Sequence, residues 1–248
     1  MSFAYSWEFI AVLLAGAASG GFINGLAGFG TALFALGWWL QIMPPLQAVA
    51  VVLAMSVASG LQGAWVVRRE IRAWRLGLFL VPGLVGIPVG LHLLALVDAT
   101  DLKLMIGGFM LAYGAFFLVR RGLPNLAPMP AIDSLVGLAG GVLGAMAGLS
   151  GALPTMWLAM RDWTKEQTRA VLQPYNLNIL GTSAIMLAWE GVYDWDTLMI
   201  MAVALPVTML SAQAGIWTFK RLGNQQFRWL LIGMTFAAGA IILLREAV

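Results

Sequence analysis

Two glycine-rich stretches decide the fold of this chain: GGFINGLAGFG at residues 20–30 and GGVLGAMAGLS at residues 140–150. They stand 120 positions apart, and each lies inside a long apolar segment. Glycine in an apolar helix either lets a second backbone approach closely or lets the helix stop. The repetition therefore predicts two homologous halves, each with one broken helix.

The composition indicates an integral membrane protein made of helices. The 248 residues are 61% hydrophobic and 10% charged, whereas a soluble domain carries about 25% charged residues. Continuous apolar runs favour helices over the alternating strands of a barrel. The excess of Lys and Arg is typical of cytoplasmic loops, so no nucleic-acid partner is expected. The absence of cysteine excludes disulfides and thiolate metal sites, and no motif predicts a metal or a cofactor.

Charged residues divide the chain into uncharged runs, and a spanning helix needs about 20 apolar residues. Single spans are predicted at 47–67, 76–97, 104–119, 170–189, 197–219 and 229–244. The glycine-rich segments 9–42 and 134–160 have lengths that fit neither one unbroken helix nor two spans. Each is either one broken crossing or a re-entrant hairpin that returns to the side it came from. The first choice gives eight crossings, and the second gives six crossings in two inverted halves.

The distribution of positive charge separates these two topologies, because Lys and Arg concentrate on the cytoplasmic side. Eight crossings would divide the 14 Lys and Arg residues equally between the two sides. Re-entrant hairpins leave only Lys103 and Arg245 outside and place all the others inside. We therefore expect inverted repeats with both termini outside. The predicted organisation is repeat 1 at residues 1–121, a linker at 122–132 and repeat 2 at 133–248.

Several motifs resemble those of the TauE/SafE family of sulfite exporters, over roughly residues 10–245. They are the glycine pattern Gly25–Gly30, the stretch Gln47–Ala50, the basic loop Arg68–Arg75 and the pattern Gly144–Gly151. The resemblance implies two homologous halves and export of sulfite or a related organosulfur or sulfonate anion across the bacterial cytoplasmic membrane. The chain departs from the family in two respects. That family is usually drawn with seven or eight crossings, and Ser150 stands where the first half has Gly30.

No Lys or Arg lies inside an apolar run, so a buried cationic ligand is not expected. Helix N-termini and backbone amides at glycine remain as means of holding a small anion near the bilayer midplane. We expect half-helices to start near Thr31 and Gly151 and to face each other from opposite sides. The candidate substrate-binding residues are Asn24, Gly28, Gly30, Thr31, Gly148, Ser150, Gly151, Thr155, Asn176 and Asn178.

Two further expectations concern polar residues beside these breaks. Asn176 and Asn178 lie about 200° apart on an ideal helix, so only one faces the site unless Pro174 disturbs the helix. Arg161, Lys165 and Arg169 are expected to attract anions to an inner mouth. No acidic residue lies in a span, so coupling would use His92, a proton of the substrate or the membrane potential.

Two other functions compete with a carrier. One is a passive anion channel. The other is a rhomboid-like intramembrane serine protease, which the motif Gly148-Leu149-Ser150-Gly151 resembles. A serine nucleophile needs a general base, and His92, the only histidine, lies in the other half. We therefore predict a transporter without enzymatic activity, whose partners are the lipid bilayer and a small anionic substrate.

Overall fold

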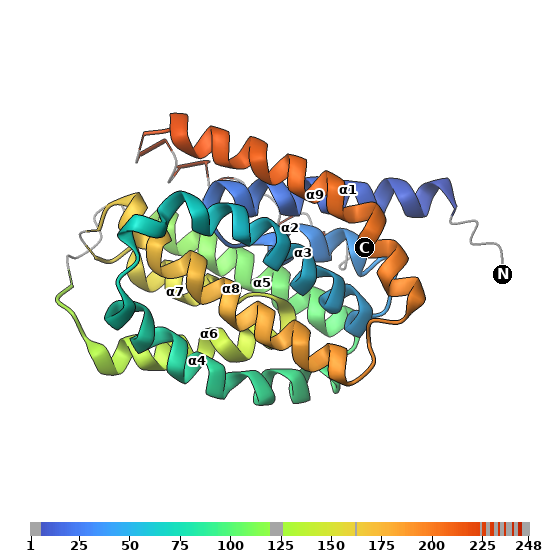
Figure 1. The fold of residues 1–248 in the computed structure, drawn as a ribbon, viewed down its shortest axis with the longest axis horizontal. Coiled ribbons are helices and arrows are strands. Elements are labelled where there is room, and N and C mark those ends of the chain that lie inside the picture. Colours follow the sequence, from blue (N-terminus) through green and yellow to red (C-terminus); the bar gives the residue numbers. More distant parts are fainter. Residues whose placement is uncertain are drawn as a thin grey trace.

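The computed structural model describes residues 6–119, 126–161 and 163–223, together with isolated positions between 225 and 244. These residues form α-helices and one short 3₁₀ helix, and no strand occurs among them (Figure 1). The helices are α1 (Trp7–Ala27), α2 (Thr31–Trp39), α3 (Pro45–Val67), η1 (Arg68–Glu70), α4 (Ala73–Leu94), α5 (Ala99–Val119), α6 (Pro130–Ala147), α7 (Ala152–Leu158), α8 (Lys165–Trp189) and α9 (Trp195–Arg221). The prediction of an all-helical protein is confirmed.

Five of these helices are long and apolar enough to cross a membrane: α1, α3, α4, α6 and α9. Three of them, α3, α4 and α9, correspond to the predicted spans 47–67, 76–97 and 197–219. Helices α5 and α8 cover the predicted spans 104–119 and 170–189 but are not among the five. The predicted span 229–244 lies outside the continuously described residues.

Local capping explains where two of the predicted boundaries differ from the structure. Helix α8 begins five residues earlier than predicted, because the side chain of Thr164 accepts from the backbone N–H of Gln167 at 3.2 Å. The side chain of Gln167 in turn accepts from the N–H of Thr164, which completes a capping box. Helix α6 begins at Pro130, inside the predicted linker, since proline is favoured at the first helical position.

The first broken segment consists of α1, a break at Gly28–Gly30 and α2, which runs back along α1. Gly20 of α1 lies against Thr31 at the start of α2, and Gly16 lies against Trp39 at its end. The indole Nε1 of Trp39 donates to the carbonyl of Leu13 at 3.0 Å. Residue numbers therefore fall along α1 as they rise along α2, which means that the two helices are antiparallel.

The second broken segment has the same form. Gly140 of α6 lies against Ser150 and Pro154, and the indole Nε1 of Trp157 donates to the carboxylate of Asp133 at 2.6 Å. Helix α7 therefore runs back along α6, as α2 does along α1. A second helix thus begins at Thr31 in one half and at Ala152 in the other, as the glycine stretches predict.

Helices α1 and α9 pack in parallel, and so do α4 and α6, through glycines that allow backbone contact. A Cβ atom added to Gly215 would lie 2.1 Å from the carbonyl oxygen of Phe22, and one added to Gly90 would lie 2.2 Å from that of Val142. Phe22 and Val142 are 120 positions apart, and Gly90 and Gly215 are 125 apart. The first helix of each half therefore packs against a long helix of the other half by the same close approach.

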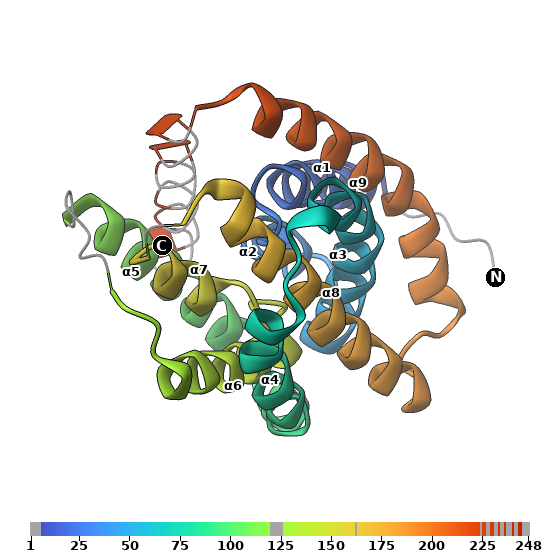
Figure 2. The same ribbon diagram turned by 60° about the vertical axis from the view of Figure 1, so that its left-hand side comes forward.

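Helices α3 and α8 lie between these two pairs and are antiparallel to each other (Figures 1 and 2). Gly63 of α3 lies near Arg169 and Gln173, close to the start of α8. Nearer the opposite ends of the two helices, Val57 of α3 lies near Gly181. Both broken segments contact this central pair, the first through α3 and the second through α8.

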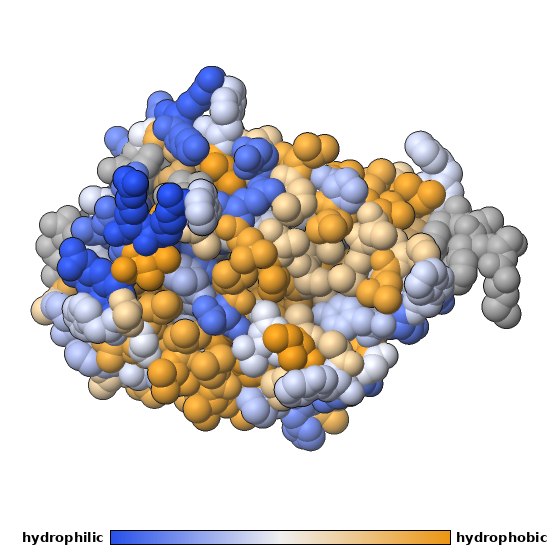
Figure 3. Space-filling model, in the orientation of Figure 1, coloured by the Kyte–Doolittle hydropathy of each residue, from blue (hydrophilic) through white to orange (hydrophobic). Residues whose placement is uncertain are grey.

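The surface separates a charged end from an apolar middle. Figure 3 shows hydrophilic residues gathered at the end where α3 and α9 finish and α4 begins. The exposed arginines there include Arg68, Arg69, Arg72 and Arg221. The outward faces of α4 and α9 instead expose large apolar side chains, among them Val85 and Leu210. An apolar outer face of this kind fits contact with lipid.

Candidate functional site

The two glycine breaks meet at a single side chain from α8, Asn176. Its Nδ2 donates to the carbonyl of Gly28 at 2.9 Å, and its Oδ1 accepts a hydrogen bond from the hydroxyl of Ser150. Gly151 also packs directly against Phe29. Asn176 lies near the middle of the 25-residue helix α8, so the breaks meet about halfway along it.

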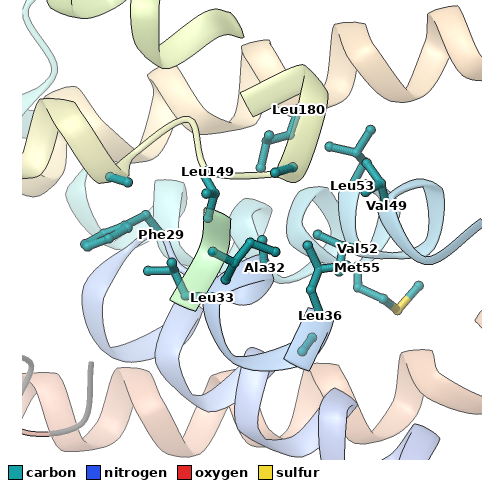
Figure 4. Close-up of a cluster of buried hydrophobic side chains, with 14 of the residues drawn as sticks. Phe29, Ala32, Leu33, Leu36, Val49, Val52, Leu53, Met55, Leu149 and Leu180 are labelled. Atoms are coloured by element: carbon teal, nitrogen blue, oxygen red, sulfur yellow. The ribbon is translucent and has the colours of Figure 1, made fainter. Parts of the chain in front are cut away.

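Apolar side chains from both halves surround this meeting point. In Figure 4, Leu149 of the second break clusters with Phe29 of the first break and with Ala32 and Leu33 of α2. Leu180 of α8 and residues of α3 complete the cluster. Polar groups in such surroundings form stronger hydrogen bonds than in water, and they are costly when unpaired.

The first break exposes unbonded polar groups at the start of α2. Gly28 and Gly30 have φ values of 83° and 97°, which glycine adopts without strain, and the N–H of Gly28 donates to the carbonyl of Asn24 at 2.8 Å. No side chain caps the start of α2. Among the described residues, the buried hydroxyl of Thr31 has no hydrogen-bond partner. A donor and an acceptor therefore remain available where α2 begins.

The second break is more fully bonded internally. Gly148 has a φ of 68°, and its N–H donates to the carbonyl of Gly144 at 2.8 Å. The hydroxyl of Thr155 donates to the carbonyl of Gly151 at 2.6 Å. Helix α7 has only seven residues, and the N–H of Ala152 donates to the carbonyl of Leu149. The two halves therefore carry similar breaks that differ in their free hydrogen-bonding capacity.

The candidates Asn24 on α1 and Asn178 on α8 differ in burial and in their hydrogen-bond partners. Asn24 is buried and donates to the hydroxyl of Ser59 at 2.6 Å and to the carbonyl of Ser56 at 3.2 Å, so it joins α1 to α3. Asn178 is exposed, and its amide donates to the carbonyl of Pro174 within the same helix. The structure thus brings Asn176 to the breaks and leaves Asn178 away from them.

The expectation that no buried cation lies near the breaks is wrong, because Arg169 is only 2% exposed. Its Nη2 donates to the carbonyl of Gly25 at 2.9 Å, and its Nη1 donates to that of Leu26 at 3.3 Å. Its Nε donates to the side chain of Gln173 at 3.3 Å. These backbone carbonyls belong to the last turn of α1, where a helix carries partial negative charge.

Arg161 does not form an open, charged mouth either. It is buried and pairs with Asp133 at 2.5 Å, and the indole of Trp157 donates to the same carboxylate oxygen. The side chain of Lys165 lies outside the described part of the chain. At the charged end, where α3 and α9 finish, the exposed positive charge comes instead from arginines such as Arg68 and Arg221.

Breaking the Arg161–Asp133 pair is expected to destabilise the protein. The single substitution Asp133→Leu leaves a buried guanidinium unpaired, which costs about 3–5 kcal/mol. The double substitution Asp133→Leu/Arg161→Met removes both charges and should recover most of that loss. Thermal unfolding in detergent measures both variants. Equal losses in the single and double variants would show that the charge pair is not the cause.

Residue spacing could have located the polar residues of α8 that face the first break. Arg169, Gln173 and Asn176 are separated by four and three positions, so they lie on one side of a helix. Gln173 also donates to the carbonyl of Gly60 at 3.1 Å. The sequence placed Arg169 at an open inner mouth rather than beside the first break, because Arg169 directly precedes the uncharged run 170–189, and it gave no role to Gln173, which is uncharged.

Comparison with known protein families matches residues 12–242 to the family described as "Sulfite exporter TauE/SafE". No curated protein and no solved structure gives a significant match to the chain. The family match covers both glycine breaks and all five helices that are long and apolar enough to cross a membrane, apart from the first residues of α1.

Proposed function

Because the chain belongs to the sulfite exporter TauE/SafE family, we propose that it exports sulfite or a related organosulfur or sulfonate anion across the bacterial cytoplasmic membrane. The observation that carries this proposal is the buried meeting of two glycine breaks, with an unpartnered Thr31 hydroxyl at the start of α2. A helix start with free amides is a ready site for an oxyanion. The two breaks meet at Asn176, halfway along α8, which suits a substrate held near the bilayer midplane.

The proposed topology has two inverted halves, each with one re-entrant hairpin. The return of α2 along α1 and of α7 along α6 supports the hairpins. The antiparallel contact of α3 with its counterpart α8, and the equivalent glycine contacts of Gly90 and Gly215, support the inversion. The exposed arginines after α3 and at the end of α9 would mark the cytoplasmic side. Both termini would then lie outside.

In the proposed site, the anion accepts hydrogen bonds at the first break and is bordered by the second. The hydroxyl of Thr31 and the first amides of α2 donate to it, and Ser150 and Asn176 lie at the junction beside them. Gly28 and Gly30 keep the backbone open to a ligand because they have no side chain. An inside-negative membrane potential favours outward movement of an anion, so export does not need an acidic residue as a proton relay.

The hydrogen bond of Ser150 supports a binding role rather than proteolysis. Its hydroxyl donates to the amide oxygen of Asn176, and an amide cannot act as a general base. A binding role, in which Ser150 and Asn176 orient each other, therefore accounts for this contact better than a nucleophilic one.

Replacing Thr31 with valine tests the site directly. Sulfite efflux from proteoliposomes should fall at least about tenfold, since a hydrogen bond to a charged group contributes about 1.5–3 kcal/mol. The melting temperature should stay the same or rise, because the variant removes a buried hydroxyl with no hydrogen-bond partner in the described ranges. The matched variant Thr31→Ser should keep most of the efflux.

Two results would contradict the proposal in different ways. Efflux by Thr31→Val equal to that of the wild type would remove Thr31 from the site. Wild-type proteoliposomes that move neither sulfite nor a simple sulfonate would overturn the proposed function itself. Saturation of the wild-type flux with sulfite concentration would distinguish a carrier from a passive channel.

A further inference from the structure

Arg169 is a buried cation whose hydrogen bonds to the described part of the chain all go to neutral groups. All of its hydrogen-bond acceptors are neutral, namely two backbone carbonyls of α1 and the amide oxygen of Gln173. The phenyl ring of Phe219 on α9 lies 4.5 Å from its guanidinium carbon. Among the described residues, the buried ion pair is that of Arg161 with Asp133, and no carboxylate pairs with Arg169.

The surroundings compensate this charge only in part. The C-terminal end of a helix carries about half a negative elementary charge, and a ring face contributes a weaker attraction. Isolated buried charges are strongly unfavourable and are normally paired. The site therefore retains a net positive character that an added anion would neutralise.

Arg169 also adjoins the first break. A Cβ atom added to Gly28 would lie 3.3 Å from the Cγ atom of Arg169 and 2.7 Å from the amide oxygen of Gln173. Three trans peptide units separate Gly28 from Thr31, so their Cα atoms are at most about 11 Å apart. The guanidinium and the unpartnered hydroxyl of Thr31 thus flank the same short segment of chain.

We propose that Arg169 is the cationic ligand of the transported anion, an inference that rests on the proposed function. In the absence of substrate, the guanidinium is held by the last carbonyls of α1. When the anion enters the first break, the guanidinium exchanges these neutral acceptors for the charged oxygens. Its planar fork matches two oxygens of a sulfite or sulfonate group, so the site selects oxyanions by both charge and shape.

The exchange would also link binding to the packing of the two halves. Arg169 belongs to the second half, and the carbonyls that it releases belong to α1 of the first half. When the guanidinium pairs with the anion, it would release the carbonyls of α1, so binding would weaken this contact between the two halves. An empty carrier and a loaded carrier would therefore differ in how firmly α8 holds the end of α1.

The test compares Arg169→Gln, Arg169→Lys and the control Arg221→Gln in proteoliposomes and in detergent. Arg221 is exposed and stacks on Trp217, so the control removes an equal charge from the surface of the molecule. In Arg169→Gln, the KM for sulfite efflux should rise at least tenfold, and the rise in melting temperature on adding sulfite should disappear. Arg169→Lys keeps the charge but lacks the planar fork, so its KM should lie between those of the wild type and Arg169→Gln. Arg221→Gln should match the wild type.

A purely structural role predicts a different pattern. Arg169→Gln would then lower the melting temperature and the maximal flux, while its KM and its stabilisation by sulfite stayed at wild-type values. That result overturns the proposal. If Arg169→Gln does not insert, comparing Arg169→Met with Arg169→Lys makes the same test, since both are unbranched and differ in charge. Wild-type protein that moves no sulfite would instead refute the proposed function. The role of Arg169 would then be tested by the melting temperatures in detergent alone. If sulfite stabilised the Gln or Met variant as much as the wild type, Arg169 would not be the cationic ligand.

Discussion

Replacing Asn176 with alanine is expected to reduce sulfite efflux by about 100-fold or more, whereas Asn178→Ala should change it less than about twofold. Asn176 bonds to both glycine breaks, through the carbonyl of Gly28 and the hydroxyl of Ser150. Each buried polar group that loses its partner costs about 1–3 kcal/mol, and tenfold in rate corresponds to about 1.4 kcal/mol. Alanine at position 176 would leave the carbonyl of Gly28 and the hydroxyl of Ser150 without these bonds, so both breaks would be affected at once.

Asn178 provides a matched control because it is the same residue type two positions along the same helix. It is exposed, and its amide bonds only within α8. Efflux rates normalised to the amount of reconstituted protein would measure both variants. Equal effects at the two positions would contradict a special role for Asn176 and would point to a general effect of side-chain loss from α8.

Replacing Gly215 with alanine is expected to destabilise the protein by at least about 2 kcal/mol. The added Cβ would lie 2.1 Å from the carbonyl oxygen of Phe22, so α1 and α9 would have to move apart. Overpacking of a close contact costs about 1–3 kcal/mol, and here the obstructing atom belongs to a helix backbone that cannot rotate away. Gly90→Ala should have a similar effect, because its Cβ would meet Val142 in the equivalent contact of α4 with α6.

The control for these variants is Gly108→Ala in α5. A Cβ atom at Gly108 meets nothing within 4 Å, so the exchange should be neutral or should stabilise the helix by about 0.5–1 kcal/mol. Melting temperatures in one detergent compare the three variants. A Gly215→Ala protein as stable as Gly108→Ala would show that α1 and α9 do not pack as closely as described.

The sequence predicted the features of this fold that depend on local chemistry. A glycine that ends a helix in the left-handed region does so because it lacks a Cβ, and the breaks at Gly28 and Gly148 follow from that property. Uncharged runs located α3, α4 and α9 because a spanning helix must be apolar along its length. Helix geometry alone also indicated that Asn176 and Asn178 cannot face the same site on a regular helix.

Only the tertiary structure decided which of these asparagines reaches the breaks and where Arg169 lies. The bonds of Arg169 to α1 join residues 143 and 144 positions apart, and that of Asn176 to Gly28 spans 148. Charge in a sequence indicates the side of a membrane, but burial depends on which distant backbone a side chain meets. Local hydrogen bonding and hydrophobicity therefore determined the helices and their breaks, whereas contacts between the halves determined the site, because its partners come together only when the chain folds.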